Sequence, residues 1–270
     1  MLKVRIITAL VLAPLVVMAI YLLPVWAFAI FVAIAAGLGV YEWSALAGLE
    51  NAPARIGYLV VFFALAAAGW LLPELRGGAL IVASAAWLVA AAIVLFYPRL
   101  NVLISAPWVV GIAGFVVALG AWSALVELRM APNGAHWVMW VLLVCWAADI
   151  GAYFAGRAMG RRKLAPKVSP GKTWEGAIGG ALLTLLVCGG LIAYAGIFSA
   201  GWLALIVFVV AVSVLGDLFE SVLKRQSQIK DSGSILPGHG GMLDRIDSVL
   251  AVAPVFALLH ALLPALTRAG

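Results

Sequence analysis

The chain has 270 residues, of which 66% are hydrophobic and only 10% are charged, and its mean hydropathy is +1.17. A soluble domain of this length is about half apolar and about a quarter charged, so this composition excludes a soluble globular protein and indicates an integral membrane protein. The formal net charge of +6 does not indicate a nucleic-acid partner, because no basic helix and no aromatic-basic stripe stands outside the apolar stretches.

Apolar stretches of about twenty residues can cross the bilayer core as helices. Nine such stretches follow one another, and no polar stretch between them is long enough for a soluble domain. We predict an all-α, polytopic membrane protein with a single membrane domain over 1–270. The expected spans are 5–23, 25–46, 57–73, 79–97, 107–126, 136–156, 174–196, 201–223 and 247–267.

The basic residues predict how these spans are oriented. With the N-terminus inside and nine crossings, fourteen of the seventeen Lys and Arg residues fall in inner loops and three fall outside. This asymmetry is the one that the positive-inside rule describes. We therefore expect a cytoplasmic N-terminus in a multi-pass protein of the cell's inner (cytoplasmic) membrane.

The acidic residues divide the chain into two halves. The first five spans, within the mostly apolar residues 1–130, carry almost no ionisable residues apart from Glu42, whereas residues 136–270 carry most of the charged residues. Ionisable residues within membrane spans indicate function by default. Seven of the eleven acids lie in the inner loops or at the inner ends of the last four spans: Asp149, Glu175, Asp217, Glu220, Asp231, Asp244 and Asp247.

The end of the eighth span carries four polar residues on one helix face. Asp217, Glu220, Ser221 and Lys224 are spaced three and four residues apart. A carboxylate buried in a membrane helix is costly unless it is paired or bound to metal. The segment is therefore either a functional site or a structural carboxylate–lysine pair that steadies the end of the helix.

The loop 226–243 is rich in glycine and polar residues, including Lys230, His239, Gly240 and Gly241. Glycines let backbone N–H groups approach a ligand closely, and such loops can cradle phosphates. A loop of this composition is more often only a turn, and a loop histidine can lack any role.

The ninth span opens with two carboxylates three residues apart, Asp244 and Asp247. Asp247 can be a plain helix cap. Asp244, however, follows the span that ends beside Asp217, and two carboxylates near lysine and arginine are typical of a Mg²⁺–triphosphate site.

The segment 169–176, SPGKTWEG, is similar to a nucleotide-binding P-loop at first sight. The pattern requires a glycine where this chain has Pro166, and no strand is expected before it, so we exclude a P-loop. We expect instead a basic loop that enters the seventh span, whose free N–H groups attract anions and whose Lys172 supplies a charge to a phosphate.

The segment from Ser221 to Asp247 reads S-x-x-K-R-x4-K-D-x-G-x-x-L-P-G-H-G-G-x-x-D-R-x-D. It resembles the signature of the phosphatidate cytidylyltransferases (CDP-diacylglycerol synthases), and the runs at 149–153 and 169–176 are also similar to that family. The resemblance implies a nine-helix homodimer in the lipid bilayer that depends on Mg²⁺. It further implies that Asp217 and Asp244 hold the metal, and that Lys172, Lys224 and Arg225 contact phosphates.

The resulting hypothesis is transfer of CMP from CTP to phosphatidic acid, giving CDP-diacylglycerol and pyrophosphate. The alternatives are another CTP-dependent lipid or polyprenol kinase, or an ion-coupled transporter, which would more often place its charges near the midplane. The candidate catalytic residues are Asp217, Asp244, Lys172, Lys224 and Arg225. The candidate substrate-binding residues are Ser169, Lys172, Thr173, Ser221, Lys230, His239, Gly240, Gly241 and Arg245. The residues expected to support them are Asp149, Glu175, Glu220, Asp231 and Asp247.

Overall fold

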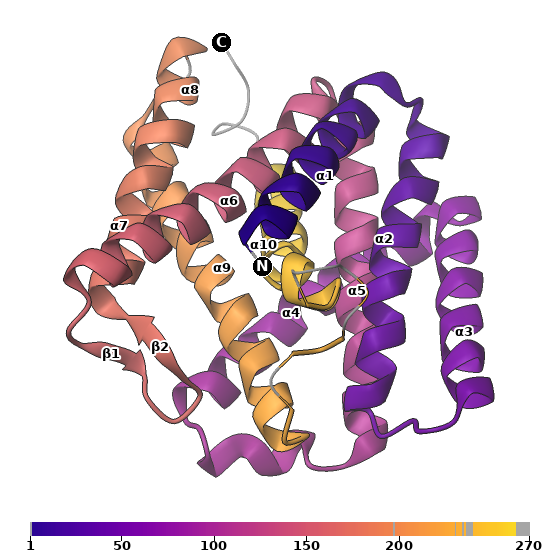
Figure 1. Cartoon of the computed structure of the whole chain (residues 1–270). Coiled ribbons are helices and arrows are strands. Elements are labelled where there is room, and N and C mark those ends of the chain that lie inside the picture. Colours follow the sequence, from indigo (N-terminus) through magenta and orange to yellow (C-terminus); the bar gives the residue numbers. More distant parts are fainter. Residues whose placement is uncertain (1, 197, 230, 234, 236–239, 263–270) are drawn as a thin grey trace.

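The computed structural model describes residues 2–196, 198–229, 231–233, 235 and 240–262, with only the backbone of residues 2–7 and 9. The described chain is almost entirely helical, with one short β-hairpin (Figure 1). The elements are α1 (Leu2–Leu22), α2 (Val25–Leu46), α3 (Ala52–Leu71), α4 (Pro73–Leu95), η1 (Arg99–Ile104), α5 (Pro107–Met130), α6 (Gly134–Met159), β1 (Lys163–Ala165), β2 (Ser169–Thr173), α7 (Trp174–Thr184), η2 (Leu185–Gly189), α8 (Gly190–Tyr194), α9 (Ala200–Gln226) and α10 (Leu243–Leu262).

The helices confirm the predicted polytopic membrane fold. Eight of them are long and apolar enough to cross a membrane, counting α7, η2 and α8 as one continuous span over Trp174–Tyr194. Within the described side chains, the first predicted span contributes a shorter apolar stretch, Leu10–Leu22. The number of spans therefore agrees approximately with the predicted nine.

Two helices begin earlier than predicted. We expected starts near residues 57 and 79, but α3 begins at Ala52 and α4 at Pro73. The Asn51 side chain accepts a hydrogen bond from the backbone N–H of Ala54 (2.8 Å) and so caps α3. A proline in the first turn, as in both helices, favours a helix start because its missing N–H is not needed there.

The early start of α4 moves Arg76 from the expected outer loop into a helix. Its guanidinium is buried, its Nε lies 2.6 Å from Glu127 Oε1 of α5, and its Nη1 donates to the Gly69 carbonyl. The charge is therefore tolerated among apolar helices because it is paired and hydrogen-bonded.

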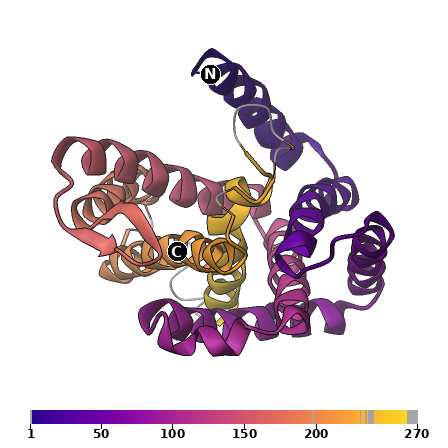
Figure 2. The same ribbon diagram turned by 60° about the horizontal axis from the view of Figure 1, so that its bottom comes forward.

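Helix α10 forms the centre of the bundle. It packs against α9, α5, α4, α2 and α6, and it lies among them in both views (Figures 1 and 2). The connection between α2 and α3, η1, the hairpin and the C-terminal end of α9 all lie toward the lower end of the molecule in Figure 1. These are segments that the basic residues predicted to be cytoplasmic.

Helices α6 and α7 pack closely against each other through small residues. A Cβ added at Gly151 would lie 2.6 Å from the Gly179 carbonyl oxygen, and one added at Gly180 would lie 2.6 Å from the Ala148 carbonyl oxygen. Glycine thus allows the two backbones to touch, as small residues do in membrane helix pairs.

The β-hairpin was not predicted. Strands β1 and β2 pair antiparallel, with Lys163 opposite Thr173 and Ala165 opposite Ser169. The expectation that no strand precedes SPGKT was wrong, because hydrogen-bonded pairing can form in a segment too short to show an apolar pattern. The exclusion of a P-loop still holds, since Pro166 replaces the required glycine and β1 is only the other arm of a hairpin.

We predict that Gly180→Ala destabilises the protein by about 1–3 kcal/mol, because the new methyl group meets backbone that cannot move easily. Gly190→Ala is the matched control, since a Cβ there meets nothing within 4 Å. The measurement is the apparent unfolding midpoint of each purified variant in detergent. Equal midpoints for the two variants would show that the α6–α7 contact is not tight.

Candidate active site

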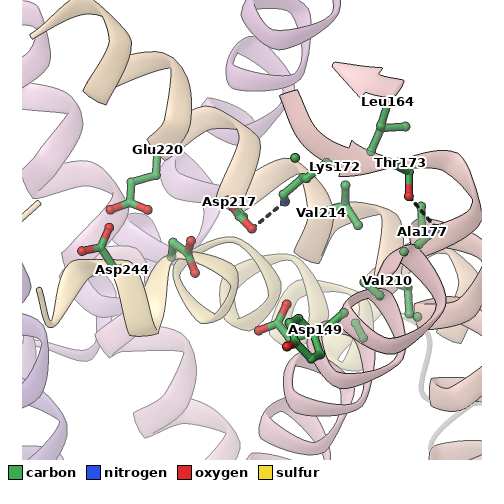
Figure 3. A pocket seen from close by; sticks show the side chains of 18 of the residues that line it. Asp149, Leu164, Lys172, Thr173, Ala177, Val210, Val214, Asp217, Glu220 and Asp244 are labelled. Atoms are coloured by element: carbon green, nitrogen blue, oxygen red, sulfur yellow. Dashed lines mark hydrogen bonds and ion pairs between the residues drawn. The ribbon is translucent and has the colours of Figure 1, made fainter. Parts of the chain in front are cut away.

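A cavity of about 730 Å³ opens between α6, β2, α7, α9 and α10 (Figure 3). Among the described residues, six acidic and four basic side chains line it, which leaves a formal excess of two negative charges. The acids are Asp149, Asp217, Glu220, Asp231, Asp244 and Asp247, and the bases are Arg157, Lys172, Lys224 and Arg245. The cavity therefore brings together most of the predicted charged residues.

Lys172 and Asp217 face each other across the cavity (Figure 3). The Lys172 ammonium, carried by β2, lies 2.5 Å from Asp217 Oδ2 on α9. The Ser221 hydroxyl lies one turn further along α9, at 3.5 Å from Asp217 Oδ1. The hairpin thus places the Lys172 ammonium beside the Asp217 carboxylate, which α9 alone would leave unpaired.

Lys224 joins α9 to α10. Its ammonium donates to Glu220 Oε2 at 3.0 Å and to Asp244 Oδ1 at 2.7 Å. The three side chains are 14%, 3% and 8% exposed, so the charges are largely removed from water. The other Asp244 oxygen, Oδ2, accepts from the backbone N–H groups of Ser232 (3.1 Å) and Gly241 (2.9 Å).

The remaining wall of the cavity combines carboxylates with apolar side chains. Asp149 on α6 and Asp247 on α10 both interact electrostatically with Asp217. Asp247 Oδ1 also accepts from the Ser248 backbone N–H at 2.6 Å. Val210 and Val214 of α9 and Ala177 of α7 also line the cavity, so it has an apolar flank beside its charged centre.

Two cations of the cavity have no carboxylate partner within the described part of the chain. Arg157 Nη1 donates to the Tyr153 hydroxyl at 2.9 Å, one turn away on the exposed side of α6. Arg245 lines the cavity from the first turn of α10, and its side chain forms no ion pair with a described residue. Unpaired cations in a cavity are available to bind anions.

Among the predicted site residues that the structure describes, six do not line the cavity: Ser169, Glu175, Ser221, Arg225, Gly240 and Gly241. The exposed Arg225 side chain instead donates through Nε to the Val168 carbonyl at 3.2 Å. The Glu175 carboxylate accepts from the backbone N–H groups of Arg161 and Arg162, and so fastens the end of α6 to the start of α7.

Thr173, Gly240 and Gly241 have local roles in the structure. Thr173 lines the cavity, and its hydroxyl also caps α7 by accepting from the Gly176 N–H at 3.1 Å. Gly241 donates to Asp244, and Gly240 has a φ of +82° that favours glycine. Lys230 and His239 were also predicted, but they lie outside the described residues.

Sequence reasoning missed three residues at or near the site. Tyr153 and Arg157 line the cavity, but Arg157 was counted only as a cytoplasmic charge. Glu42 of α2 accepts from the Leu243 N–H at 2.8 Å and from the Ser232 hydroxyl at 3.2 Å. Its signal was a carboxylate inside an apolar span, which marks a functional residue by default.

The donor set fits a hard divalent cation. Asp217 and Asp244 offer carboxylate oxygens to one cavity, and each is already satisfied by a positively charged ammonium. Among the described residues, no three His, Cys, Asp or Glu side chains form a metal-binding group. Mg²⁺ commonly uses only one or two carboxylates together with substrate phosphates, so two carboxylates are sufficient.

The chain is similar to known cytidylyltransferases over nearly its whole length. The model of the cytidylyltransferase family matches residues 3–263. A phosphatidate cytidylyltransferase of Pseudomonas aeruginosa is 45% identical over 96% of this chain and 97% of its own length. One from Haemophilus influenzae is 38% identical over 96% and 99%, and one from Brucella suis is 47% identical over 48% and 49%.

We predict that Lys224→Met destabilises the protein by about 3–5 kcal/mol, because it leaves two buried carboxylates without their shared cation. Lys167→Met, an exposed residue between the hairpin strands, is the control. Apparent unfolding midpoints in detergent measure the difference. A Lys224→Met midpoint equal to that of the control would contradict the pairing described above.

Proposed function

Because this chain belongs to the cytidylyltransferase family, we propose that it makes CDP-diacylglycerol by transferring CMP from CTP to the phosphate of phosphatidic acid. The observation that carries this proposal is the cavity itself. It combines lysine-paired carboxylates, two arginines that form no ion pair with a described residue, and an apolar flank within a bundle of membrane-spanning helices.

The reaction requires little acid–base chemistry from the protein. A phosphate oxygen of phosphatidic acid attacks the α-phosphorus of CTP, and the bond from that phosphorus to the bridging oxygen breaks. Pyrophosphate leaves with the bonding electrons. Because the attacking oxygen is already anionic, no strong general base is needed, and catalysis depends on positioning and on neutralising charge.

The basic side chains supply that neutralisation. Arg157 and Arg245 bind phosphate oxygens first, since neither forms a close ion pair with a described carboxylate. Lys172 and Lys224 then exchange part of their contact with Asp217 and Asp244 for contact with phosphates. The lysine ammonium suits this exchange because it is a point charge on a flexible chain, whereas arginine can hold a phosphate with two hydrogen bonds.

Asp217 and Asp244 would hold Mg²⁺, the predicted cofactor. The ion would supply charge that stabilises the leaving pyrophosphate. The cavity supports this assignment because its described residues already carry an excess of two negative charges, and two anionic substrates enter it. Glu220 pairs with Lys224, and Asp149 interacts with Lys172 and Arg245, so these two carboxylates orient the cations around the two ligands. Asp247 lies beside them and interacts with Asp217.

The lipid enters from the apolar flank. Val210, Val214 and Ala177 line this side, and the exposed Tyr153 and Arg157 lie on α6 at the same cavity. The diacylglycerol part of phosphatidic acid can then remain in contact with lipid while its phosphate meets Arg157. This arrangement explains why the protein needs no soluble domain to bind a water-insoluble substrate.

The protein acts in the cell's inner (cytoplasmic) membrane as a homodimer. The excess of basic residues in the inner loops supports a site that faces the cytoplasm, where CTP is made. The homodimer is supported by the family resemblance.

We predict that Asp217→Asn and Asp244→Asn each abolish formation of CDP-diacylglycerol by purified, folded protein. The assay supplies phosphatidic acid, Mg²⁺ and CTP labelled at the α-phosphorus. A chelator should also stop the reaction in the wild type. Glu50→Gln, an exposed carboxylate-to-amide change in the loop before α3, serves as the matched control and should retain full activity.

The label distinguishes the proposed reaction from its alternatives. Incorporation of the α-phosphorus into lipid supports cytidylyl transfer. If the label stays in CDP while a lipid becomes phosphorylated, the protein is a kinase instead. Full activity in either asparagine variant would refute the metal assignment.

We predict that Arg157→Ala raises the KM for phosphatidic acid roughly tenfold and changes the KM for CTP much less, because one charge-assisted contact to the lipid phosphate is lost. Arg157→Lys should recover part of the affinity. Arg161→Ala is the control, since this exposed arginine lies just beyond α6 and outside the cavity. Equal changes in the two KM values would show that Arg157 does not select the lipid.

A further inference from the structure

Glu42 is a buried carboxylate far from the catalytic half of the chain in sequence. It belongs to α2, and its side chain is only 2% exposed. Its two hydrogen-bonding partners, Ser232 and Leu243, are 190 and 201 residues further along the chain. The connection from α9 to α10 therefore contacts the N-terminal half at this side chain.

The contacts of Glu42 lead directly to Asp244. Glu42 Oε2 accepts from the Leu243 N–H, and Leu243 immediately precedes Asp244. The same oxygen accepts from the Ser232 hydroxyl, while the Ser232 N–H donates to Asp244 Oδ2. Ser232 is thus held between the two carboxylates, so a displacement of Glu42 is transmitted to Asp244 from two directions.

Two glycines allow the connecting segment to lie against this carboxylate. A Cβ added at Gly233 would collide with Glu42 Oε1 and would lie 2.6 Å from its Cδ. A Cβ added at Gly241 would collide with the Ser232 hydroxyl and would lie 2.5 Å from Glu42 Oε2. The segment is therefore packed onto Glu42 with no room for a larger residue at either position.

A simple structural ion pair does not account for Glu42. No basic side chain of the described residues pairs with it, and its Oε1 has no hydrogen-bond partner among them. A carboxylate in an apolar helix without a cation is costly. The contacts that compensate for this cost are the hydrogen bonds from Ser232 and Leu243, which fix the segment next to Asp244.

We infer that Glu42 is a positioning residue for the reaction: it holds Ser232 and Leu243 so that the Asp244 carboxylate keeps its place in the cavity. The inference rests on the proposed function only in assigning Asp244 to Mg²⁺. Glu42 itself lies outside the set of residues that line the main cavity, so it acts through Ser232, Leu243 and Asp244.

The test compares Glu42→Ala with Glu42→Gln in the full-length protein. Hydrogen–deuterium exchange reports on the amides of Ser232, Gly241 and Leu243, which donate to the two carboxylates. Glu42→Ala should speed exchange in peptides that contain them and raise the Mg²⁺ concentration for half-maximal activity roughly 10- to 100-fold. Glu42→Gln keeps a carbonyl oxygen that can accept both hydrogen bonds, and should restore protection and most of the activity.

Glu127→Ala is the matched control. It removes another carboxylate that is hydrogen-bonded within the bundle, where Glu127 pairs with Arg76. Glu127→Ala should lower the stability of the folded protein without changing the Mg²⁺ concentration for half-maximal activity. The inference would be wrong if Glu42→Ala raised the Mg²⁺ concentration for half-maximal activity no more than Glu127→Ala does. It would also be wrong if Glu42→Ala left the hydrogen–deuterium exchange of these amides unchanged. If the exchange accelerates but the wild type makes no CDP-diacylglycerol, the proposed function fails and the mechanical role of Glu42 stands.

A second pair of variants checks the contact without relying on Glu42→Ala alone. Gly233→Ala should by itself accelerate exchange and raise the Mg²⁺ requirement, because all three atoms nearest to the added Cβ belong to Glu42. In the Glu42→Ala background the same change should have little further effect. Additive effects of the two substitutions would overturn the inference.

Discussion

The shared ion pair of Lys224 with Glu220 and Asp244 is the constraint on which the site depends. Helix α9 ends and α10 begins with carboxylates that would repel each other in an apolar surrounding, and one ammonium holds both. Because α10 is the central helix, its first turn fixes where Asp244 lies relative to α9. The pairing therefore links the packing of the bundle to the chemistry of the cavity.

Charge accounts for how such a site can hold two anionic substrates. Lys172 and Lys224 are engaged by carboxylates, whereas Arg157 and Arg245 have no carboxylate partner among the described residues. The arginines attract phosphates, and the lysines can redistribute between carboxylate and phosphate as the substrates arrive. A site built in this way stays satisfied before and during the reaction, which suits a place of low dielectric constant.

The sequence was sufficient for the membrane fold, the family and the charged centre. Helical spacing placed Asp217, Glu220 and Lys224 on one face, and the structure gathers them with Asp244 in one cavity. The hairpin escaped prediction because strand pairing in 163–173 depends on backbone hydrogen bonds rather than on an apolar pattern. The roles of Arg157 and Glu42 were not predicted because they depend on neighbours distant in sequence. The Arg225 side chain likewise donates to the Val168 carbonyl, a neighbour that the sequence alone does not reveal.

The hold of Glu42 on the α9–α10 connection has a consequence for how this protein can be divided. A fragment that began at α6 would contain all ten described charged side chains of the cavity. It would nevertheless lack the acceptor for the Leu243 N–H and the Ser232 hydroxyl, so its last helix would start from a turn held only by Asp244. The apolar N-terminal helices are thus more than a membrane anchor. The phosphate-binding site is complete only when both parts of the polypeptide are assembled.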